Sequence, residues 1–240
     1  MCRVDQDSRR MFRHVLFLIC VLWGQAARAE VLVFAAASLK EPIDQLAADM
    51  DDVTVTYGGS GILARQISLG APADVVLLAN DEWMALLADG GHLQPSTVVD
   101  FASNRLVMVG DSGAHDLPLN SSAIEKALGG GRLAVGLTEA VPSGVYAKSA
   151  LQSLGLWDGL ESQLAEVDNV RAALALVVRG QAPLGIVFQT DVRISGAVRQ
   201  VAVFPAQSHP KIRYQAALTA NATSEAVNFL ARLSGPEGQS

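Results

Sequence analysis

Short apolar stretches alternate with segments of helical periodicity along most of the chain. Most of these stretches contain few polar residues, as is typical of strands buried on both faces of a parallel sheet. We expect strands at 31–37, 53–57, 74–79, 105–109, 132–136, 184–188, 198–204 and 212–219, and helices at about 62–67, 81–87, 122–128, 145–154, 170–178 and 224–233, besides one that begins at residue 38. The alternation predicts an α/β fold with mostly parallel sheets flanked by helices.

The first apolar stretch ends in small residues that lead into Ser38. Ser38 and Glu41 have the spacing of a capping box, and Pro42 is tolerated in the first turn of a helix. We therefore expect a helix to start at the carboxyl end of a buried strand, where exposed N–H groups favour anions. For one such turn alone, a purely structural cap is the simpler interpretation.

The same arrangement recurs three times. Helices are expected directly after Ser60, after Ser143 and after Asp168-Asn169, with Asp168 as a good N-cap. Each helix start offers unpaired N–H donors, and the three serines add hydroxyl groups. No lysine or arginine lies in any of the four turns. If the turns converge, they form an anion site of neutral donors, which suits a fully ionised oxyanion.

Residues 1–29 are predicted to be an export signal and not part of the fold. Arginines between positions 9 and 13 precede a short apolar run at 15–21, and the A-x-A site at 27–29 predicts cleavage before residue 30. The run is too short for a permanent membrane span. The paired arginines also fit a twin-arginine signal, so both this route and ordinary secretion stay open.

Loss of the signal changes the charge and the cysteine content. Both cysteines, Cys2 and Cys20, are in the signal, so the mature chain has no disulfide and no thiolate metal site. The formal net charge of the whole chain is −6, and the signal removes five arginines and two aspartates, which leaves −9. A chain this acidic is not expected to bind nucleic acid or an anionic membrane.

The sequence predicts that the chain is not an enzyme. The segment 58–62 has isoleucine where the nucleophile elbow G-x-S-x-G requires its last glycine. The mature chain's histidines lie in polar, loop-like sequence without a partner pattern, and there is no P-loop or dinucleotide motif. The enzymatic alternative is a secreted serine hydrolase that uses Ser60 or Ser143, which requires a histidine within hydrogen-bond reach of that serine.

Stretches along most of the mature chain resemble the periplasmic molybdate-binding proteins of ABC importers. They are VFAAASL (33–39), LARQI (63–67), GAPAD (70–74), GGRLAVG (130–136), VPSGVYAKSAL (141–151), LGLWD (154–158), NVRAALALV (169–177) and APLGIV (182–187). The resemblance implies a two-lobed type II periplasmic-binding-protein fold with the ligand in the interlobe cleft. Lobe 1 would comprise residues 30–103 and 204–240, and lobe 2 would comprise residues 104–203.

The resemblance also implies a ligand and the residues that hold it. Family members bind molybdate or tungstate through hydroxyl and backbone N–H groups, so molybdenum enters only as molybdate and no cofactor is expected. The matching positions are Ser38, Ser60, Ser143, Val170 and Phe188. The family typically has a tyrosine at the last of these, and losing its hydroxyl would cost roughly 1–3 kcal/mol. The family often has alanine at position 143, so we expect Ser143 to replace part of that loss.

The remaining expectations concern location and partners. The resemblance implies a monomer that works in the periplasm, outside the membrane, and delivers the oxyanion to the permease of an ABC transporter. Phe188 leaves open a relative adapted to another oxyanion such as sulfate. A ligand-sensing domain of a regulator shares the architecture, but the signal peptide and the lack of a helix-turn-helix segment count against it. Relatives usually continue beyond 235–236 with an amphipathic segment, so the last helix is expected to be less covered here.

Overall fold

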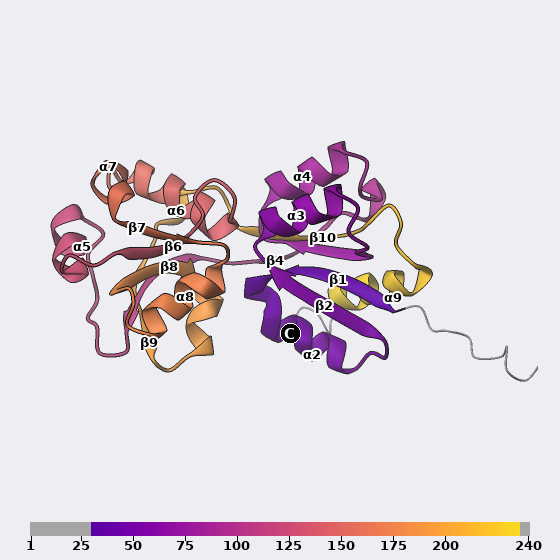
Figure 1. Ribbon diagram of the computed structural model, residues 1–240, viewed down its shortest axis with the longest axis horizontal. Coiled ribbons are helices and arrows are strands. Elements are labelled where there is room, and N and C mark those ends of the chain that lie inside the picture. Colours follow the sequence, from indigo (N-terminus) through magenta and orange to yellow (C-terminus); the bar gives the residue numbers. More distant parts are fainter. Residues whose placement is uncertain (1–29, 236–240) are drawn as a thin grey trace, which may run out of the picture. The chain divides into compact units, whose positions relative to one another are not determined.

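The computed structural model describes residues 30–235, so the predicted export signal lies outside the described residues. Within the unit that starts at Val31, the strands form two five-stranded sheets (Figure 1). This arrangement confirms the predicted α/β class. Among the described residues, no helix combines the length and the apolar composition that a membrane crossing requires.

The first sheet has the strand order β2-β1-β3-β10-β4. Its strands are β1 (Val31–Ala36), β2 (Val53–Gly58), β3 (Val75–Leu78), β10 (Arg213–Leu218) and β4 (Val99–Ser103). Strands β1, β2 and β3 are parallel, whereas β10 is antiparallel to both of its neighbours. Helices α3 (Ser60–Ser68) and α4 (Asp81–Asp89) lie on one face, and α2 (Lys40–Ala48) and α9 (Ser224–Ser234) lie on the other (Figure 1).

The second sheet repeats this plan in the order β7-β6-β8-β5-β9. Its strands are β7 (Leu164–Val167), β6 (Leu133–Gly136), β8 (Leu184–Phe188), β5 (Leu106–Asp111) and β9 (Val198–Val203). Here β5 is the reversed strand, antiparallel to β8 and β9. The helices are α5 (Ser121–Leu128), α6 (Pro142–Ser153), α7 (Trp157–Leu160) and α8 (Val170–Val178). Short 3-10 turns are η1 (Ala37–Leu39), η2 (Pro95–Thr97), η3 (Glu161–Gln163), η4 (Gln189–Ile194) and η5 (Ala206–Ser208).

Each sheet therefore contains one reversed strand in its fourth position. The chain crosses from one sheet to the other twice, between β4 and β5 and between β9 and β10. The reversed strands β5 and β10 are the strands that follow these two chain crossings. Each time the chain passes from one sheet to the other, the strand that it enters thus runs against the parallel strands of that sheet.

Sequence periodicity missed two strands, β4 and β7, for the same physical reason. Both lie at the edge of a sheet, and their residues are half-buried or exposed, so they show no apolar run. The strands that periodicity did predict include β3, β6 and β8, which are buried along their whole length. Apolar runs therefore indicate burial on both faces of the sheet, and these two edge strands lack that signal, whereas the edge strands β2 and β9 were predicted.

Helix α6 begins in close contact with the end of β6. A Cβ atom on Gly144 would lie 2.1 Å from the carbonyl oxygen of Gly136 and 2.5 Å from that of Leu137. Only glycine permits this approach, because any side chain would collide with the strand backbone. The contact holds Ser143, the residue before it, at the carboxyl end of the sheet.

We expect Gly144→Ala to lower the free energy of unfolding of the mature protein by about 1–3 kcal/mol, because the helix must move off the strand. Urea unfolding of residues 30–240 measures this. Gly196→Ala is the control, since a Cβ there meets nothing within 4 Å, and it should change stability by less than about 0.5 kcal/mol. Equal effects of the two substitutions would contradict the argument.

Candidate anion-binding site

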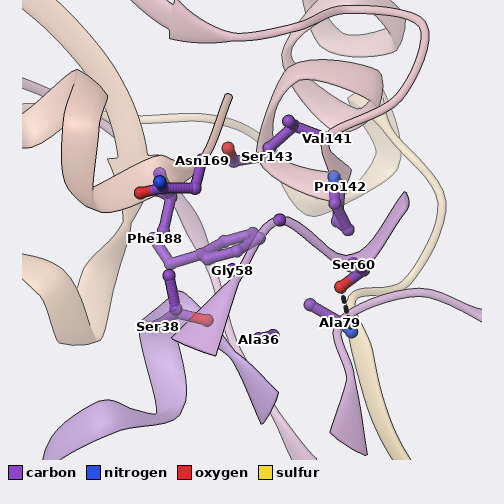
Figure 2. Close-up of a pocket in the computed structure, with 13 residues that line it drawn as sticks. Ala36, Ser38, Gly58, Ser60, Ala79, Val141, Pro142, Ser143, Asn169 and Phe188 are labelled. Atoms are coloured by element: carbon purple, nitrogen blue, oxygen red, sulfur yellow. Dashed lines mark hydrogen bonds between the residues drawn. The ribbon is translucent and has the colours of Figure 1, made fainter. Parts of the chain in front are cut away.

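Turns at the carboxyl ends of strands from both sheets surround one small pocket (Figure 2). Its lining residues are Ala36, Ala37, Ser38, Gly58, Gly59, Ser60, Ala79, Val141, Pro142, Ser143, Asn169, Val170 and Phe188, and none of these carries a charge. The empty space is about 200 Å³, part of it open to solvent. This is less than the roughly 300–1,000 Å³ of pockets that hold organic ligands, so the pocket favours a small ion over an organic metabolite.

All five residues singled out from the sequence line this pocket, but Ser38 is not the predicted helix cap. Ser38 lies in η1, and its Oγ is 2.9 Å from the hydroxyl oxygen of Tyr214. Leu39 occupies the cap position of α2 and makes no side-chain cap bond. The predicted capping box with Glu41 is wrong, because a 3-10 turn separates the strand from the helix and both side chains bind other partners.

Ser60 is the first residue of α3, and Gly59 takes the cap position. The side chain of Ser60 is fully buried, and its Oγ accepts a hydrogen bond of 3.1 Å from the backbone nitrogen of Ala79 (Figure 2). The hydroxyl oxygen is thus already an acceptor, which leaves its single proton for a further acceptor.

The glycines beside Ser60 bring the two sheets together. A Cβ atom on Gly59 would lie 2.3 Å from the carbonyl oxygen of Asp168, and one on Gly61 would lie 2.5 Å from that of Ala140. Both carbonyl groups belong to turns of the second sheet. The glycine-rich turn after β2 is therefore explained by close backbone approach across the pocket, and not by the φ angles of these glycines.

Ser143 is the second residue of α6, so this helix starts three residues before the predicted position 145. Its side chain is fully buried, and its Oγ has no hydrogen-bond partner among the residues that the structure describes. Leaving a buried hydroxyl unpaired costs about 1–3 kcal/mol, so it is retained only where something gains from it. The hydroxyl of Ser143 is thus available to form a hydrogen bond with a ligand in the pocket.

Helix α8 begins at Val170, and its cap is Asn169 instead of the predicted Asp168. The Oδ1 atom of Asn169 accepts a hydrogen bond of 2.9 Å from the backbone nitrogen of Ala172. This bond satisfies the third N–H of the first turn. The first N–H, that of Val170, has no acceptor within the helix and belongs to a residue that lines the pocket.

Phe188, at the end of β8, forms an apolar wall of the pocket. Its side chain is only 1 % exposed, and its ring packs edge-on against Tyr146 and Tyr214 at centroid distances of 6.4 Å and 6.0 Å. A phenyl ring offers no donor, so the polar contacts of the pocket must come from the serines and the helix starts.

Arg171 follows Val170 but does not itself line the pocket, although its Nη2 atom donates to the backbone oxygen of Ser38 at 3.4 Å. Its Nη1 and Nη2 atoms donate to the two carboxylate oxygens of Glu41 at 2.8 Å and 2.5 Å, and its Nε donates to Asp191 at 2.6 Å. Glu41 is on α2 beside the first sheet, whereas Asp191 lies in η4, three residues after the end of β8. The guanidinium group is thus matched by two carboxylates and joins the two sheets.

The pKa values of the two acids are shifted in opposite directions, by different causes. The hydrogen bond from Arg171 lowers the pKa of Glu41. Burial raises the pKa of Asp191 to about 6, and the attraction of Arg171 only partly opposes it. Asp191 also accepts a hydrogen bond of 3.1 Å from the backbone nitrogen of Phe188, so it supports the pocket wall.

Two further hydrogen bonds join the sheets near the pocket. The indole nitrogen of Trp83 donates to the carbonyl oxygen of Ala140 at 2.9 Å, and the hydroxyl of Tyr146 donates to that of Ala79 at 3.3 Å. Trp83 is half-buried and packs against the hydrophobic core. Its ring lies between α4 and the turn before α6 because its N–H needs an acceptor.

Sequence reasoning missed the residues behind the pocket: Arg171, Asp191, Tyr214 and Asn104. Each acts through partners far away in the sequence, as with the 176 positions between Ser38 and Tyr214. Local spacing carries no signal of such pairs. Arg171 lies inside the stretch 169–177 that supports the family resemblance, but that stretch does not by itself indicate a cross-sheet contact.

The hydrolase alternative requires a histidine beside Ser60 or Ser143. The hydrogen bond of Ser60 Oγ comes from the Ala79 backbone, and Ser143 Oγ has no partner within the described part of the chain. His209 lies against Tyr146 instead, with 5.9 Å between the ring centroids. The geometry therefore lacks the nucleophile–base pair on which such a mechanism depends. Within residues 30–235, no group of three histidine, cysteine or acidic side chains is placed to hold a metal ion.

Two sheets with a pocket at their junction are the architecture of a solute-binding protein. The chain belongs to the family of bacterial extracellular solute-binding proteins, whose model matches residues 31–240. It is 41% identical to the Escherichia coli K12 protein named molybdate-binding protein ModA, over 88% of this chain and 86% of that one. It is 39% identical to the ModA of Haemophilus influenzae, over 79% and 78%. The structure of the Azotobacter vinelandii periplasmic molybdate-binding protein matches with a TM-score of 0.74 at 24% identity, over 87% and 94% of the two chains.

The raised pKa of Asp191 predicts a pH dependence. Between pH 4 and 6 the folded chain binds a proton at Asp191 that the unfolded chain has largely lost, so this group's contribution to stability falls as the pH rises through that range. Asp191→Asn abolishes the titration. The wild-type free energy of unfolding minus that of the variant should therefore fall between pH 4 and 6, by about 2–3 kcal/mol at most.

Urea unfolding at a series of pH values measures this difference. Asp158→Asn, at an exposed acid in α7, is the matched control and should give a profile parallel to the wild type. A constant offset between wild type and Asp191→Asn would show that Asp191 keeps an ordinary pKa.

Proposed function

We propose that the mature chain captures molybdate, and also tungstate, in the periplasm and delivers it to the permease of an ABC transporter. One observation carries this proposal: a small uncharged pocket holds the fully buried hydroxyl of Ser143 with no described partner. The two relatives at 41% and 39% identity that are named molybdate-binding proteins support the choice of oxyanion.

Neutral donors are sufficient for a dianion that accepts hydrogen bonds and donates none. A hydrogen bond to a charged group contributes about 1.5–3 kcal/mol net, and a helix N-terminus adds a favourable partial charge. A handful of such bonds reaches micromolar affinity after the entropic cost of binding. The positive charge of Arg171, next to Val170 in sequence, is balanced by Glu41 and Asp191. The proposed contacts with the anion therefore come from neutral groups alone.

The proposed contacts come from both sheets. Ser38, Ser60 and Ser143 would donate through their hydroxyl groups, and Val170 through its backbone N–H. Phe188 would exclude water from the remaining side. Each of these residues lines the pocket, and the three serine side chains are 5 % exposed or less.

The proposed transport cycle uses two lobes, residues 30–103 with 204–240 and residues 104–203. An ion that contacts both lobes stabilises the arrangement in which they meet, so binding shifts the population towards the closed form. The contacts of Arg171 with Glu41 and of Trp83 with Ala140 would belong to that form. A monomer in the closed form would present one surface to the permease.

Isothermal titration of residues 30–240 with molybdate, and with sulfate in parallel, tests the proposal. We expect one molybdate ion per chain with micromolar or tighter affinity and no heat from sulfate. Sulfate binding without molybdate binding would mean that Phe188 has changed the preferred oxyanion. No heat from either ion, nor from tungstate, would contradict the proposed function.

Ser143→Ala should have opposite effects on binding and on stability. The affinity for molybdate should fall about tenfold or more, because a donor to the dianion is lost. The ligand-free variant should be as stable as the wild type or more stable, because an unpaired buried hydroxyl is removed. Titration and urea unfolding measure the two quantities.

Ser68→Ala serves as the matched control. Its hydroxyl donates to the carbonyl oxygen of Arg65 at the far end of α3, so its loss should leave the affinity unchanged. Unchanged affinity in Ser143→Ala would remove Ser143 from the site and with it the compensation for Phe188.

A further inference from the structure

A line of three side chains leads from the first chain crossing to the pocket. Asn104 lies in this crossing, between β4 and β5, and its Nδ2 is 3.1 Å from the hydroxyl oxygen of Tyr214. That hydroxyl oxygen is 2.9 Å from the Oγ of Ser38. Ser38 lines the pocket, whereas Tyr214 does not.

The direction of these hydrogen bonds follows from the first residue. The backbone N–H of Arg105 donates to Asn104 Oδ1 at 2.9 Å, and because a backbone N–H can only donate, this side of the amide is the oxygen. The other side is therefore the nitrogen, which donates to Tyr214 and also to Thr190 Oγ1 at 2.9 Å. The amide orientation is thus set by chemistry.

The bond from Asn104 leaves the phenol oxygen free to accept a second one, so the direction towards Ser38 depends on the phenol's own proton. This proton is buried, and among the described residues Ser38 Oγ is the remaining partner within reach, so it is satisfied when Tyr214 donates to Ser38 Oγ. Ser38 Oγ then accepts, and the serine proton cannot point back at Tyr214. It is left for the interior of the pocket.

We propose that Tyr214 is a positioning residue that fixes the hydroxyl of Ser38 as a donor to the bound oxyanion. This inference rests on the proposed function. Tyr214 would not contact the ion. By donating to Ser38 Oγ, it prevents the alternative hydrogen bond in which Ser38 donates to Tyr214. The rotation of the hydroxyl is restricted before binding, so less ordering remains to be done when the ion arrives.

The surroundings of Tyr214 suit this role. Its side chain is 1 % exposed, and its ring packs between Phe188 and Phe101 at centroid distances of 6.0 Å and 6.2 Å. Burial raises the pKa of Tyr214, so the phenol keeps its proton at all pH values relevant to binding. Phe188 supplies no donor of its own but holds the ring that orients one.

The relay predicts a specific loss of affinity. Tyr214→Phe keeps the ring and removes the proton that Ser38 accepts, so the affinity for molybdate should fall about three- to tenfold. Because Tyr214 acts only through Ser38, the same substitution in a Ser38→Ala background should cost no further affinity. Titration of the wild type, both single variants and the double variant of residues 30–240 completes the cycle.

Tyr57→Phe is the matched control. This tyrosine is on β2 of the same sheet, and its hydroxyl donates to Asp44 at 2.6 Å, away from the pocket lining. Its removal should leave the affinity unchanged. If Tyr214→Phe fails to fold, Asn104→Ala takes its place in the cycle, because it removes the amide that donates to the Tyr214 hydroxyl.

The outcomes separate this inference from the proposed function. A wild type that binds an oxyanion, with no loss in Tyr214→Phe or with equal loss in both backgrounds, overturns the relay and leaves the function standing. If the wild type binds none of molybdate, tungstate and sulfate, both the relay and the proposed function are overturned. A loss confined to the background that contains Ser38 supports the relay.

Discussion

The structure is organised around a constraint on buried anions: an ion held without a cation needs donors that have no other partner. Neither sheet supplies enough of them alone. The first sheet brings the hydroxyl groups of Ser38 and Ser60, and the second brings Ser143 and the start of α8 at Val170. The proposed site is therefore complete only where the two sheets meet, so a ligand bound there would couple binding to a change in their arrangement.

The same constraint explains features beyond the lining. Backbone approaches at Gly59 and Gly144 bring helix starts to the lining of one small pocket. Arg171, the cation adjacent in sequence to Val170, is matched by carboxylates from both sheets, so it joins the sheets without adding charge to the lining. The pocket can thus remain neutral in a chain whose formal charge without the predicted signal is −9. In the proposed function it would recognise an anion by geometry and donor number instead of by overall attraction.

Features that depend on local sequence patterns were predicted correctly, whereas contacts between residues far apart in the sequence were missed. Runs of apolar residues correctly predicted β3, β6 and β8, because these strands are buried on both faces, and they missed the half-exposed edge strands β4 and β7. The capping box of Ser38 and Glu41 had the right spacing but the wrong partners, since Tyr214 and Arg171 bind these side chains from remote parts of the chain. The positions of the four turns were predictable, whereas the network that orients them was not.

The most direct test is a crystal structure of residues 30–240 with molybdate, in which the anomalous scattering of molybdenum locates the ion. The account predicts one anomalous peak inside the pocket. Its oxygen atoms should lie within hydrogen-bond distance of the hydroxyls of Ser38, Ser60 and Ser143 and of the backbone nitrogen of Val170, with no lysine or arginine in contact. A peak outside the pocket, or a guanidinium or ammonium group bonded to the ion, would contradict recognition by neutral donors.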